Sequence, residues 1–211
     1  MTALLVVTDV DSTLIRDEVI ELLADEAGAR AEITEITTRA MHGDIDFLES
    51  LHQRVSALGD LPEAVLARTL ERVRVSPGAE ELIAAVHERD GRIGAISGGF
   101  SQILEPLAER LGLDLWRANK LEVVDGRLTG RVTEPIVDAR RKAETLAGWA
   151  AELGVPMERT VAVGDGANDL QMMAIAGVSV GYRPKPVVAE RADVVIPAPQ
   201  GLDAVIPFLP R

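Results

Sequence analysis

Three short apolar runs in this sequence are followed by acidic, hydroxyl or glycine residues, and this pattern restricts the possible folds more than any other feature. Residues 3–7 precede Asp9, "RIGAI" precedes Ser97, and "TVAVG" precedes Asp165. Stretches with helical spacing separate the runs, which is typical of βαβ units and a mostly parallel sheet. Ligands bind beyond the carboxyl ends of the strands in such sheets, so we expect these three side chains to meet at one edge.

The fold class that follows is α/β, with a mostly parallel, Rossmann-like sheet covered by helices on both faces. Residues 16–74 contain four stretches with helical spacing and no convincing strand, so we expect a four-helix cap inserted after the first strand. We expect helices over 18–24 (ending at Gly28), 31–41 and 45–58, and one that begins at Pro62.

A small β-hairpin insertion is predicted at about residues 120–134, because Asp125-Gly126 is a strong type I′ turn signal. The expected division is therefore an α/β catalytic core of residues 1–15 and 75–211, carrying the hairpin, and a helical cap of residues 16–74.

The composition excludes several classes of function. The 34 acidic and 22 basic residues give a net charge of −12, and no block of Lys/Arg is present, which argues against nucleic acid or membrane as a partner. The absence of cysteine excludes disulfides, thiolate catalysis and Cys-ligated zinc. The acidic motif at Asp9 leaves no room for a signal peptide, so we expect a cytoplasmic protein. Either a monomer or a homodimer is compatible with the sequence.

The polar residues at the strand ends point to one chemistry when they are taken together. Alone, Asp9-Val10-Asp11 is more often a turn or a cap, "SGG" a flexible turn, and "GDGAND" a loop. Carboxylates gathered in one cleft require a cation, and their hard oxygen atoms suit Mg²⁺. Glycines beside Ser97 and Asp165 let backbone N–H groups approach an anion. This combination predicts phosphoryl transfer through a carboxylate nucleophile.

The segments "DVDSTLI", "ISGGF", "IVDARRKAETL" and "VGDGANDLQMM" resemble the four motifs of the haloacid dehalogenase-like hydrolase superfamily. Within it, "DVDSTLIRDE", "RAMHGDIDFLESLHQRV" and "SGGF" are similar to the phosphoserine phosphatase family. The resemblance implies Mg²⁺-dependent hydrolysis of O-phospho-L-serine to L-serine and phosphate, the last step of serine biosynthesis, through an aspartyl phosphate. Longer members of this family carry a regulatory region before the first motif, which we do not expect here.

The resemblance also implies roles for individual residues. Asp9 is the expected nucleophile, and Asp11 the group that protonates the leaving oxygen and then deprotonates water. Mg²⁺ is expected on Asp9, the backbone carbonyl of Asp11 and Asp165, with Asp169 either a ligand or a neighbour of one. The phosphoryl group and the substrate are expected to contact Ser97, Gly98, Gly99, Lys142 and Asn168. From the residues alone, Lys142 reads as an ordinary solvated helix lysine.

Substrate choice is expected to depend on the inserted helices. By resemblance, Glu18 binds the ammonium group and Arg54 the carboxylate of the substrate, while Met41 and Phe47 form an apolar wall. Without the resemblance, Glu18 reads as a first-turn helix acid, Arg54 as a surface residue, and the other two as core residues. Lys185 in "GYRPKPVVAERAD" has no assigned role.

Two alternatives remain open. One is a related lidded phosphatase or phosphotransferase that acts on another small phosphomonoester. The other is a non-catalytic regulator that binds phosphate or an amino acid. Such a regulator would tolerate the loss of Asp9 or Asp11, yet both residues are present.

Overall fold

The apolar runs form one seven-stranded sheet with the order β4-β3-β2-β1-β5-β6-β7 in the computed structural model, which describes residues 2–42 and 44–210. All neighbouring strands are parallel except β3 and β4. The strands are β1 (Leu5–Thr8), β2 (Arg92–Phe100), β3 (Leu115–Val124), β4 (Arg127–Thr133), β5 (Thr160–Gly164), β6 (Val178–Tyr182) and β7 (Val194–Ile196). The predicted α/β class and parallel sheet are confirmed.

β1 lies at the centre of the sheet, and its register aligns the polar residues at its carboxyl end. Thr8 pairs with Ala95 on one side and with Val163 on the other. Asp9, the residue after β1, therefore lies at the level of Ile96 and Gly164, each of which directly precedes Ser97 or Asp165. β1 is buried on both faces, which explains why its sequence is a continuous apolar run instead of an alternating one.

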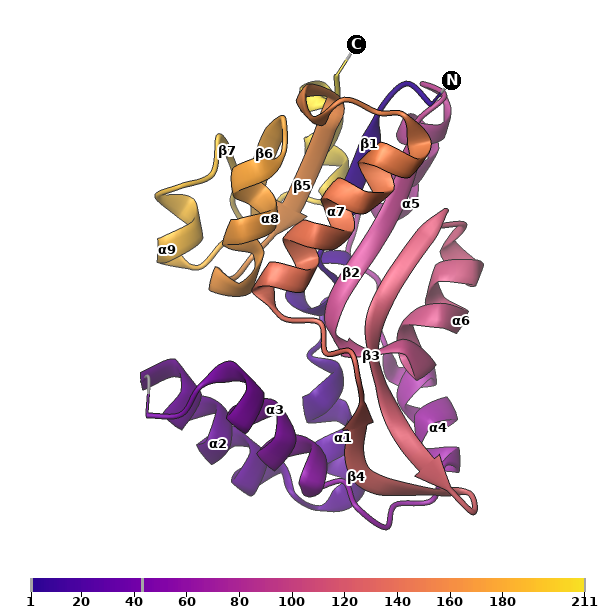
Figure 1. Ribbon diagram of the computed structural model, residues 1–211, viewed down its shortest axis with the longest axis vertical. Coiled ribbons are helices and arrows are strands. Elements are labelled where there is room, and N and C mark those ends of the chain that lie inside the picture. Colours follow the sequence, from indigo (N-terminus) through magenta and orange to yellow (C-terminus); the bar gives the residue numbers. More distant parts are fainter. Residues whose placement is uncertain (1, 43, 211) are drawn as a thin grey trace.

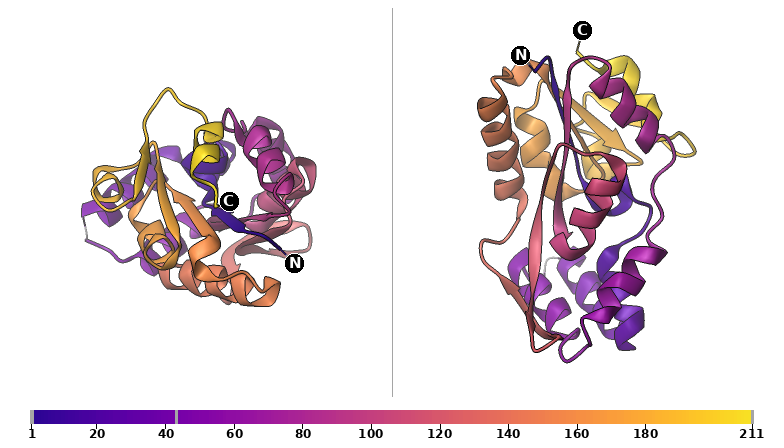
Figure 2. Two further views of the ribbon diagram at one scale, coloured as in Figure 1. Left: turned by 90° about the horizontal axis from the view of Figure 1, so that it is seen from above. Right: turned by 90° about the vertical axis from the view of Figure 1, so that its right-hand side faces the viewer.

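Helices cover both faces of the sheet (Figure 2). α7 (Ala139–Leu153) and α8 (Leu170–Ile175) bury Leu146, Trp149 and Met172 against one face of β1. α5 (Ala79–His87), α6 (Ser101–Leu111) and the C-terminal 3₁₀ turns Leu202–Phe208 cover the opposite face. The short helix α9 (Pro186–Ala189) follows β6. No helix in the described residues has both the length and the apolar character needed to cross a membrane.

The four inserted helices lie together beyond the carboxyl ends of β1 and β5, beside the hairpin end of β3 and β4 (Figure 1). They are α1 (Val19–Ala27), α2 (Arg30–His42), α3 (Phe47–Ser56) and α4 (Ala64–Arg72). α1 ends at Gly28, which adopts the left-handed conformation expected of a C-terminal glycine. The third helix is shorter than predicted because Asp46 caps it by accepting a hydrogen bond from Glu49 N.

The two ends of the insertion are joined by a neck of residues 15–17 and 74–76. Ile15 forms an antiparallel bridge with Val75, and Arg16 N donates to Arg74 O at 2.8 Å. Asp17 accepts hydrogen bonds from the backbone N of Arg74 at 2.8 Å and from its Nε at 3.0 Å. The inserted helices are thus attached to the sheet through two adjacent segments.

The predicted Asp-Gly hairpin is present, but it belongs to the main sheet. Asp125 and Gly126 both have positive φ angles (50° and 72°), as a type I′ turn requires. β3 starts at Leu115 and pairs in parallel with β2 before it turns into the hairpin, a continuation that the sequence reading missed. Pro62 bridges Arg127 of this hairpin, and the predicted fourth helix begins two residues later, at Ala64, so only its predicted start was wrong.

Candidate active site

Asp9 follows the end of β1 directly and precedes an irregular helical turn. Its backbone N donates to Val163 O of β5 at 2.8 Å, and its side chain is buried. The turn spans Val10–Leu14 and contains Ser12 at a φ of 59°, an uncommon conformation for a residue other than glycine. This reversal places the side chains of Asp9 and Asp11 at the carboxyl edge of the sheet.

Three carboxylates form a buried acid cluster at this edge. Asp9, Asp165 and Asp169 each offer an oxygen within 4.8 Å of the others. Asp169 Oδ2 accepts hydrogen bonds from the backbone N of Asp165 and of Gly166, both at 3.2 Å. A Cβ on Gly164 would lie 2.5 Å from the Asp169 carboxyl group, so only glycine permits this approach. The predicted convergence of β1 and β5 ends is therefore observed.

Lys142 lies inside the acid cluster, with its side chain only 1% exposed. Its Nζ contacts Asp9 Oδ1 and donates to Asp169 Oδ1 at 2.8 Å. Burial opposes its charge, but the two carboxylates more than offset this, so the pKa of Lys142 is raised. Burial and the charge of Asp169 raise the pKa of Asp9 well above its ordinary value. The reading of Lys142 as a solvated helix residue was wrong.

Asp11 points away from the acid cluster, toward the start of α1. Its Oδ1 accepts a hydrogen bond from Val19 N at 2.9 Å, and its Oδ2 accepts one from Ser97 Oγ at 3.4 Å. Burial, together with the charge of Glu18, raises the pKa of Asp11 to about 7. The two acids of the first motif thus have different partners, and Asp11 can both give and take a proton near neutral pH.

The "SGG" segment bulges out of β2 beside Asp11. Ile96 pairs with Arg117 and Phe100 with Asn119, so β2 has two more residues than β3 between these pairs. A Cβ on Gly99 would lie 2.8 Å from Asp11 Oδ2, which explains a glycine there.

Asn119 holds the "SGG" bulge in place, a role that the sequence analysis missed. Its side chain donates to Gly98 O and accepts from Val137 N, both at 2.7 Å. Nothing in the local pattern of β3 marks this residue, since its partners are distant in the chain.

The structure brings three of the four residues assigned to substrate choice to the same edge. Glu18 accepts a hydrogen bond from Ser12 Oγ at 2.7 Å, and burial raises its pKa. Burial lowers the pKa of Arg54, while the charges of Glu18 and Asp11 oppose this shift. Phe47 Cζ lies 3.6 Å from the Cβ position of Gly98, so α3 reaches the "SGG" bulge. The side chain of Met41 lies outside the described residues.

Two further polar side chains lie at the Gly164–Asp169 loop, one from the loop itself and one from the segment after β6. Asn168 Oδ1 lies 2.6 Å from the Cβ position of Gly166, so it faces the backbone of this loop. Lys185, which had no assigned role, forms an ion pair with Asp165, with its Nζ 3.2 Å from Oδ2. Only its position between two prolines distinguished Lys185 in the sequence.

The acid cluster fits a divalent cation. Its three buried carboxylates repel one another, and hard oxygen donors of this kind suit Mg²⁺, which needs only one or two carboxylates. Asp9 and Asp165 come from neighbouring strands, and Asp169 is oriented by two backbone N–H groups. The chain therefore has the donors for such an ion beside the "SGG" bulge.

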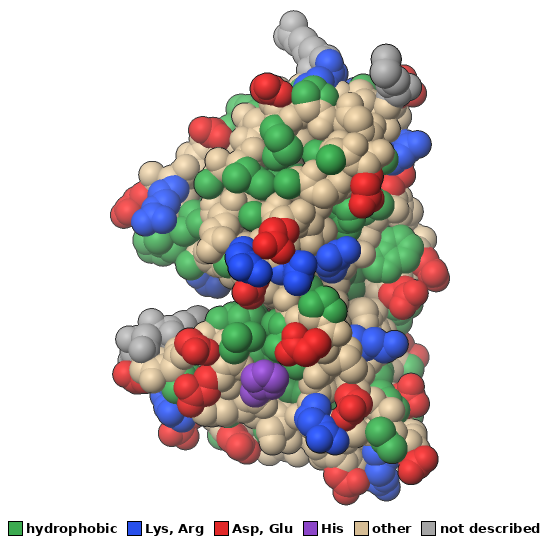
Figure 3. All heavy atoms as spheres, in the orientation of Figure 1, with side chains coloured by type: hydrophobic (Ala, Val, Ile, Leu, Met, Phe, Trp, Pro, Cys, Tyr) green, Lys and Arg blue, Asp and Glu red, His purple; other side chains and the backbone are tan. Residues whose placement is uncertain are grey.

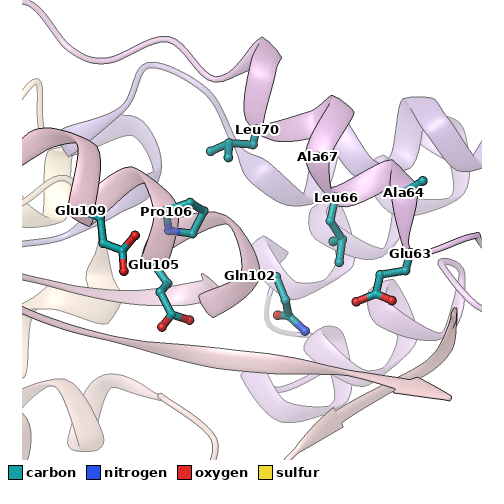
Figure 4. A pocket seen from close by; sticks show the side chains of 9 residues that line it. All are labelled: Glu63, Ala64, Leu66, Ala67, Leu70, Gln102, Glu105, Pro106 and Glu109. Atoms are coloured by element: carbon teal, nitrogen blue, oxygen red, sulfur yellow. The ribbon is translucent and has the colours of Figure 1, made fainter.

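A cleft separates the part of the molecule that holds β5–β7 from the part that holds α2 and α3 (Figure 3). The carboxyl ends of β1 and β5 and the first turn of α7 face it (Figure 1). A different hollow lies between α4 and α6, lined by Leu66, Leu70, Pro106 and three glutamates among others (Figure 4). It contains no residue of the acid cluster. The reactive groups thus belong to the cleft between the two parts.

A buried aspartate, a lysine, an acid cluster and a glycine-rich bulge lie together at the carboxyl ends of the strands, and such groups are suited to hold a divalent cation and a phosphoryl group. The family model for haloacid dehalogenase-like hydrolases matches residues 6–174, and the chain belongs to this family. Three similar proteins are described as phosphoserine phosphatases. Those of Streptomyces coelicolor and Mycobacterium tuberculosis are 51% and 48% identical over 97% of this chain. That of Streptococcus thermophilus is 44% identical over 92%.

The chain spans half the length of the Streptomyces and Mycobacterium relatives and 91% of the Streptococcus one. Two solved structures match it over their whole length and its own, each with a TM-score of 0.93 and 38% identity. One is described as a phospho-aspartyl intermediate analogue of phosphoserine phosphatase, and the other as a substrate-bound phosphoserine phosphatase complex.

Proposed function

We propose that this chain is a Mg²⁺-dependent phosphatase that hydrolyses O-phospho-L-serine to L-serine and phosphate, the last step of serine biosynthesis. The observation that carries the chemistry is the buried Asp9 carboxylate at the end of β1, held by Lys142 and flanked by Asp11 with a pKa of about 7. The Streptococcus relative, which covers 92% of the chain, and the substrate-bound structure, which covers all of it, support the substrate.

The reaction follows from the separate environments of the two acids. Asp9 attacks phosphorus and forms an aspartyl phosphate, while Asp11 gives its proton to the departing serine oxygen. Asp11, now a carboxylate, takes a proton from water, and the resulting hydroxide attacks phosphorus and releases Asp9. One group serves as acid and then as base, which is efficient when its pKa lies near the working pH.

The other residues of the site bind and orient the substrate. Lys142, Ser97 and the backbone of Gly98, beside Gly99, hold the phosphoryl oxygens. The ammonium group binds Glu18 and the carboxylate binds Arg54, whose planar fork fits it. Phe47 and Met41 cover the apolar part, and Asn168 contacts the substrate.

Mg²⁺ is the cofactor that we propose. Asp9, Asp165 and the backbone carbonyl of Asp11 would hold the ion, with Asp169 as a direct ligand or as a neighbour. When bound, the ion would supply positive charge that offsets the charge on the phosphoryl oxygens. We further propose a cytoplasmic monomer or homodimer with no nucleic-acid or membrane partner. The inserted helices, residues 16–74, would act as a cap on a catalytic core of residues 1–15 and 75–211.

Phosphate release from a panel of phosphomonoesters tests the proposal. Wild type is measured with Mg²⁺ and with EDTA, and beside Asp9→Asn. Asp60→Asn is the matched control, because Asp60 is an exposed acid whose φ of 66° asparagine also tolerates. We expect phosphoserine to be preferred by orders of magnitude, and EDTA or Asp9→Asn to abolish turnover. Metal-dependent turnover that favours another ester would retain the chemistry and refute the substrate, and no turnover would refute both.

A further inference from the structure

Lys185 is connected to Asp165 through both its backbone and its side chain. Its backbone N donates to Asp165 O at 2.8 Å, and its Nζ lies 3.2 Å from Asp165 Oδ2. A Cβ on Gly166 would lie 3.4 Å from the same Nζ, so the glycine leaves room for the ammonium group. The side chain also lies close enough to Glu18 and Asp9 for their charges to act on it.

The residues around Lys185 restrict its backbone and place it at the start of a helix, where lysine is an unfavourable residue. Pro184 and Pro186 flank it, and it is the N-cap residue of α9 in an extended conformation (φ −63°, ψ 154°). An N-cap position favours Ser, Thr, Asp or Asn, and a cation is unfavourable at the start of a helix. A residue that breaks a local rule in this way is often retained for a function.

The composition of the chain makes this lysine unusual in a second way. The chain has 22 basic residues but only three lysines: Lys120, Lys142 and Lys185. Two of these three contact the acid cluster, although nearly every other cation in the chain is an arginine. Lysine offers a compact point charge, whereas arginine offers a planar fork, and a compact group suits the contacts of Lys142 and Lys185 with single carboxylate oxygens.

We propose that Lys185 is a positioning residue that holds one oxygen of Asp165 and thereby presents the other to the metal ion. The inference rests on the metal site of the proposed function. Asp165 follows β5 directly and lies in a glycine-rich loop, where Lys185 is the described side chain with which it forms an ion pair. Without this contact the carboxylate is free to rotate away from Asp9 and Asp169, which repel it.

Replacing Lys185 should change the affinity for Mg²⁺ in opposite directions, depending on whether its role is to position Asp165 or only to balance charge. Removing a positive charge beside a cation site strengthens cation binding if charge alone matters. Loss of an orienting partner weakens it, in other metal sites by about 10- to 100-fold. Weaker Mg²⁺ binding by a folded Lys185 variant is therefore the result expected of lost orientation and the opposite of the result expected of charge alone.

Calorimetric titration of chelator-treated protein with Mg²⁺, without substrate, tests the proposal. We expect Lys185→Met to raise the Kd for Mg²⁺ by about tenfold or more. Lys185→Gln keeps an N–H donor for Asp165, so its Kd should lie between those of Lys185→Met and wild type. Lys120→Met, at an exposed position of β3, should bind as wild type does. Thermal melting in EDTA checks that each variant is folded.

Each outcome of the titration decides between the proposals. If wild type binds Mg²⁺ and Lys185→Met binds it equally well or more tightly, the positioning role is refuted and the proposed function stands. If folded wild type does not bind Mg²⁺ at all, the metal site of the proposed function is refuted, and the role of Lys185 with it.

Discussion

The function proposed for Asp11 should be costly to the stability of the protein. The pKa of Asp11 is raised from 3.8 to about 7, because burial and Glu18 disfavour its charged form. A carboxyl group with a raised pKa in the folded state contributes stability that is fully present at a pH below its unfolded pKa. This contribution is lost as the pH rises through the folded pKa. The charge of Asp11 therefore opposes folding above about pH 7.

We expect Asp11→Asn to be more stable than wild type above neutral pH, although it should be inactive. Asparagine retains an oxygen for Val19 N. The gain in the free energy of unfolding should reach several kcal/mol, up to about 4, and should shrink as pH falls from about 7 to about 4. Urea unfolding in EDTA across this range measures it. A difference that does not change with pH would contradict the assignment.

Arg54 should control affinity for the amino-acid part of the substrate. Replacing it with alanine removes a charged hydrogen-bond donor worth roughly 1.5–3 kcal/mol. We expect KM for phosphoserine to rise by about tenfold or more, with a much smaller change for a phosphomonoester that lacks a carboxylate. Arg131→Ala, at a 74% exposed position of β4, is the control. Equal losses for both esters would refute a contact between Arg54 and the substrate carboxylate.

The neck of the insertion should depend on the pairing of Asp17 with Arg74. Burial raises the pKa of Asp17, but hydrogen bonds from the side chain and the backbone of Arg74 outweigh it, and the net shift is downward. A carboxyl group with a lowered pKa in the folded state stabilises the protein at a pH above its unfolded pKa. This stabilisation is lost as the pH falls through the folded pKa.

Asp17→Asn should lower the free energy of unfolding, because it removes a charged partner of Arg74. The loss should be only about 1–2 kcal/mol at neutral pH, since the Arg74 side chain is largely exposed and solvent screens its charge. The loss should diminish in acid. Asp60→Asn removes an exposed ion pair with Arg127 and should change stability by less than about 0.5 kcal/mol. Chemical unfolding of both variants measures the difference, and an equal effect of both would show that the neck gains nothing from Asp17.

Elements with a local cause were predictable from the sequence. Gly28, Gly112 and Gly154 end their helices with positive φ angles, as expected of left-handed C-terminal glycines, and Asp125-Gly126 forms the hairpin. The pattern of strand ends likewise predicted that Asp9 and Asp165 would meet.

Contacts between distant segments were not predictable in this way. The burial of Lys142 and the hydrogen bonds of Asn119 depend on partners more than 15 residues away. The continuation of β3 into the main sheet depends on pairing with β2, which no local pattern of the strand reveals. Roles assigned to Lys142, Glu18 and Arg54 came from resemblance, because each is an ordinary helix residue by pattern alone.

At the scale of the whole molecule, the cleft in an acidic protein must attract an anionic substrate through local charge. The chain carries a net charge of −12, yet the cleft contains Lys142, Arg54 and Lys185. Mg²⁺ would add two further positive charges at the same place. Binding of the substrate should therefore depend on these groups and not on the overall field.

The inserted helices should close over the bound substrate. Phe47 of α3 already approaches Gly98 of the core, and the neck is the only covalent attachment of residues 16–74. We expect bound substrate analogue to slow amide hydrogen exchange around Glu18 and Arg54, while amides in the middle of α7 remain unchanged. Unchanged exchange around both Glu18 and Arg54 would contradict closure of the inserted helices.

Trapping the covalent intermediate tests directly whether Asp9 is the nucleophile. Wild type and Asp9→Asn are mixed with phosphoserine and Mg²⁺, quenched in acid within the first turnovers, and digested for mass spectrometry. We expect one added phosphoryl group on the wild-type peptide that contains Asp9, and none on the Asp9→Asn peptide. Rapid turnover without a phosphoryl group on Asp9, or turnover that survives Asp9→Asn, would contradict this role.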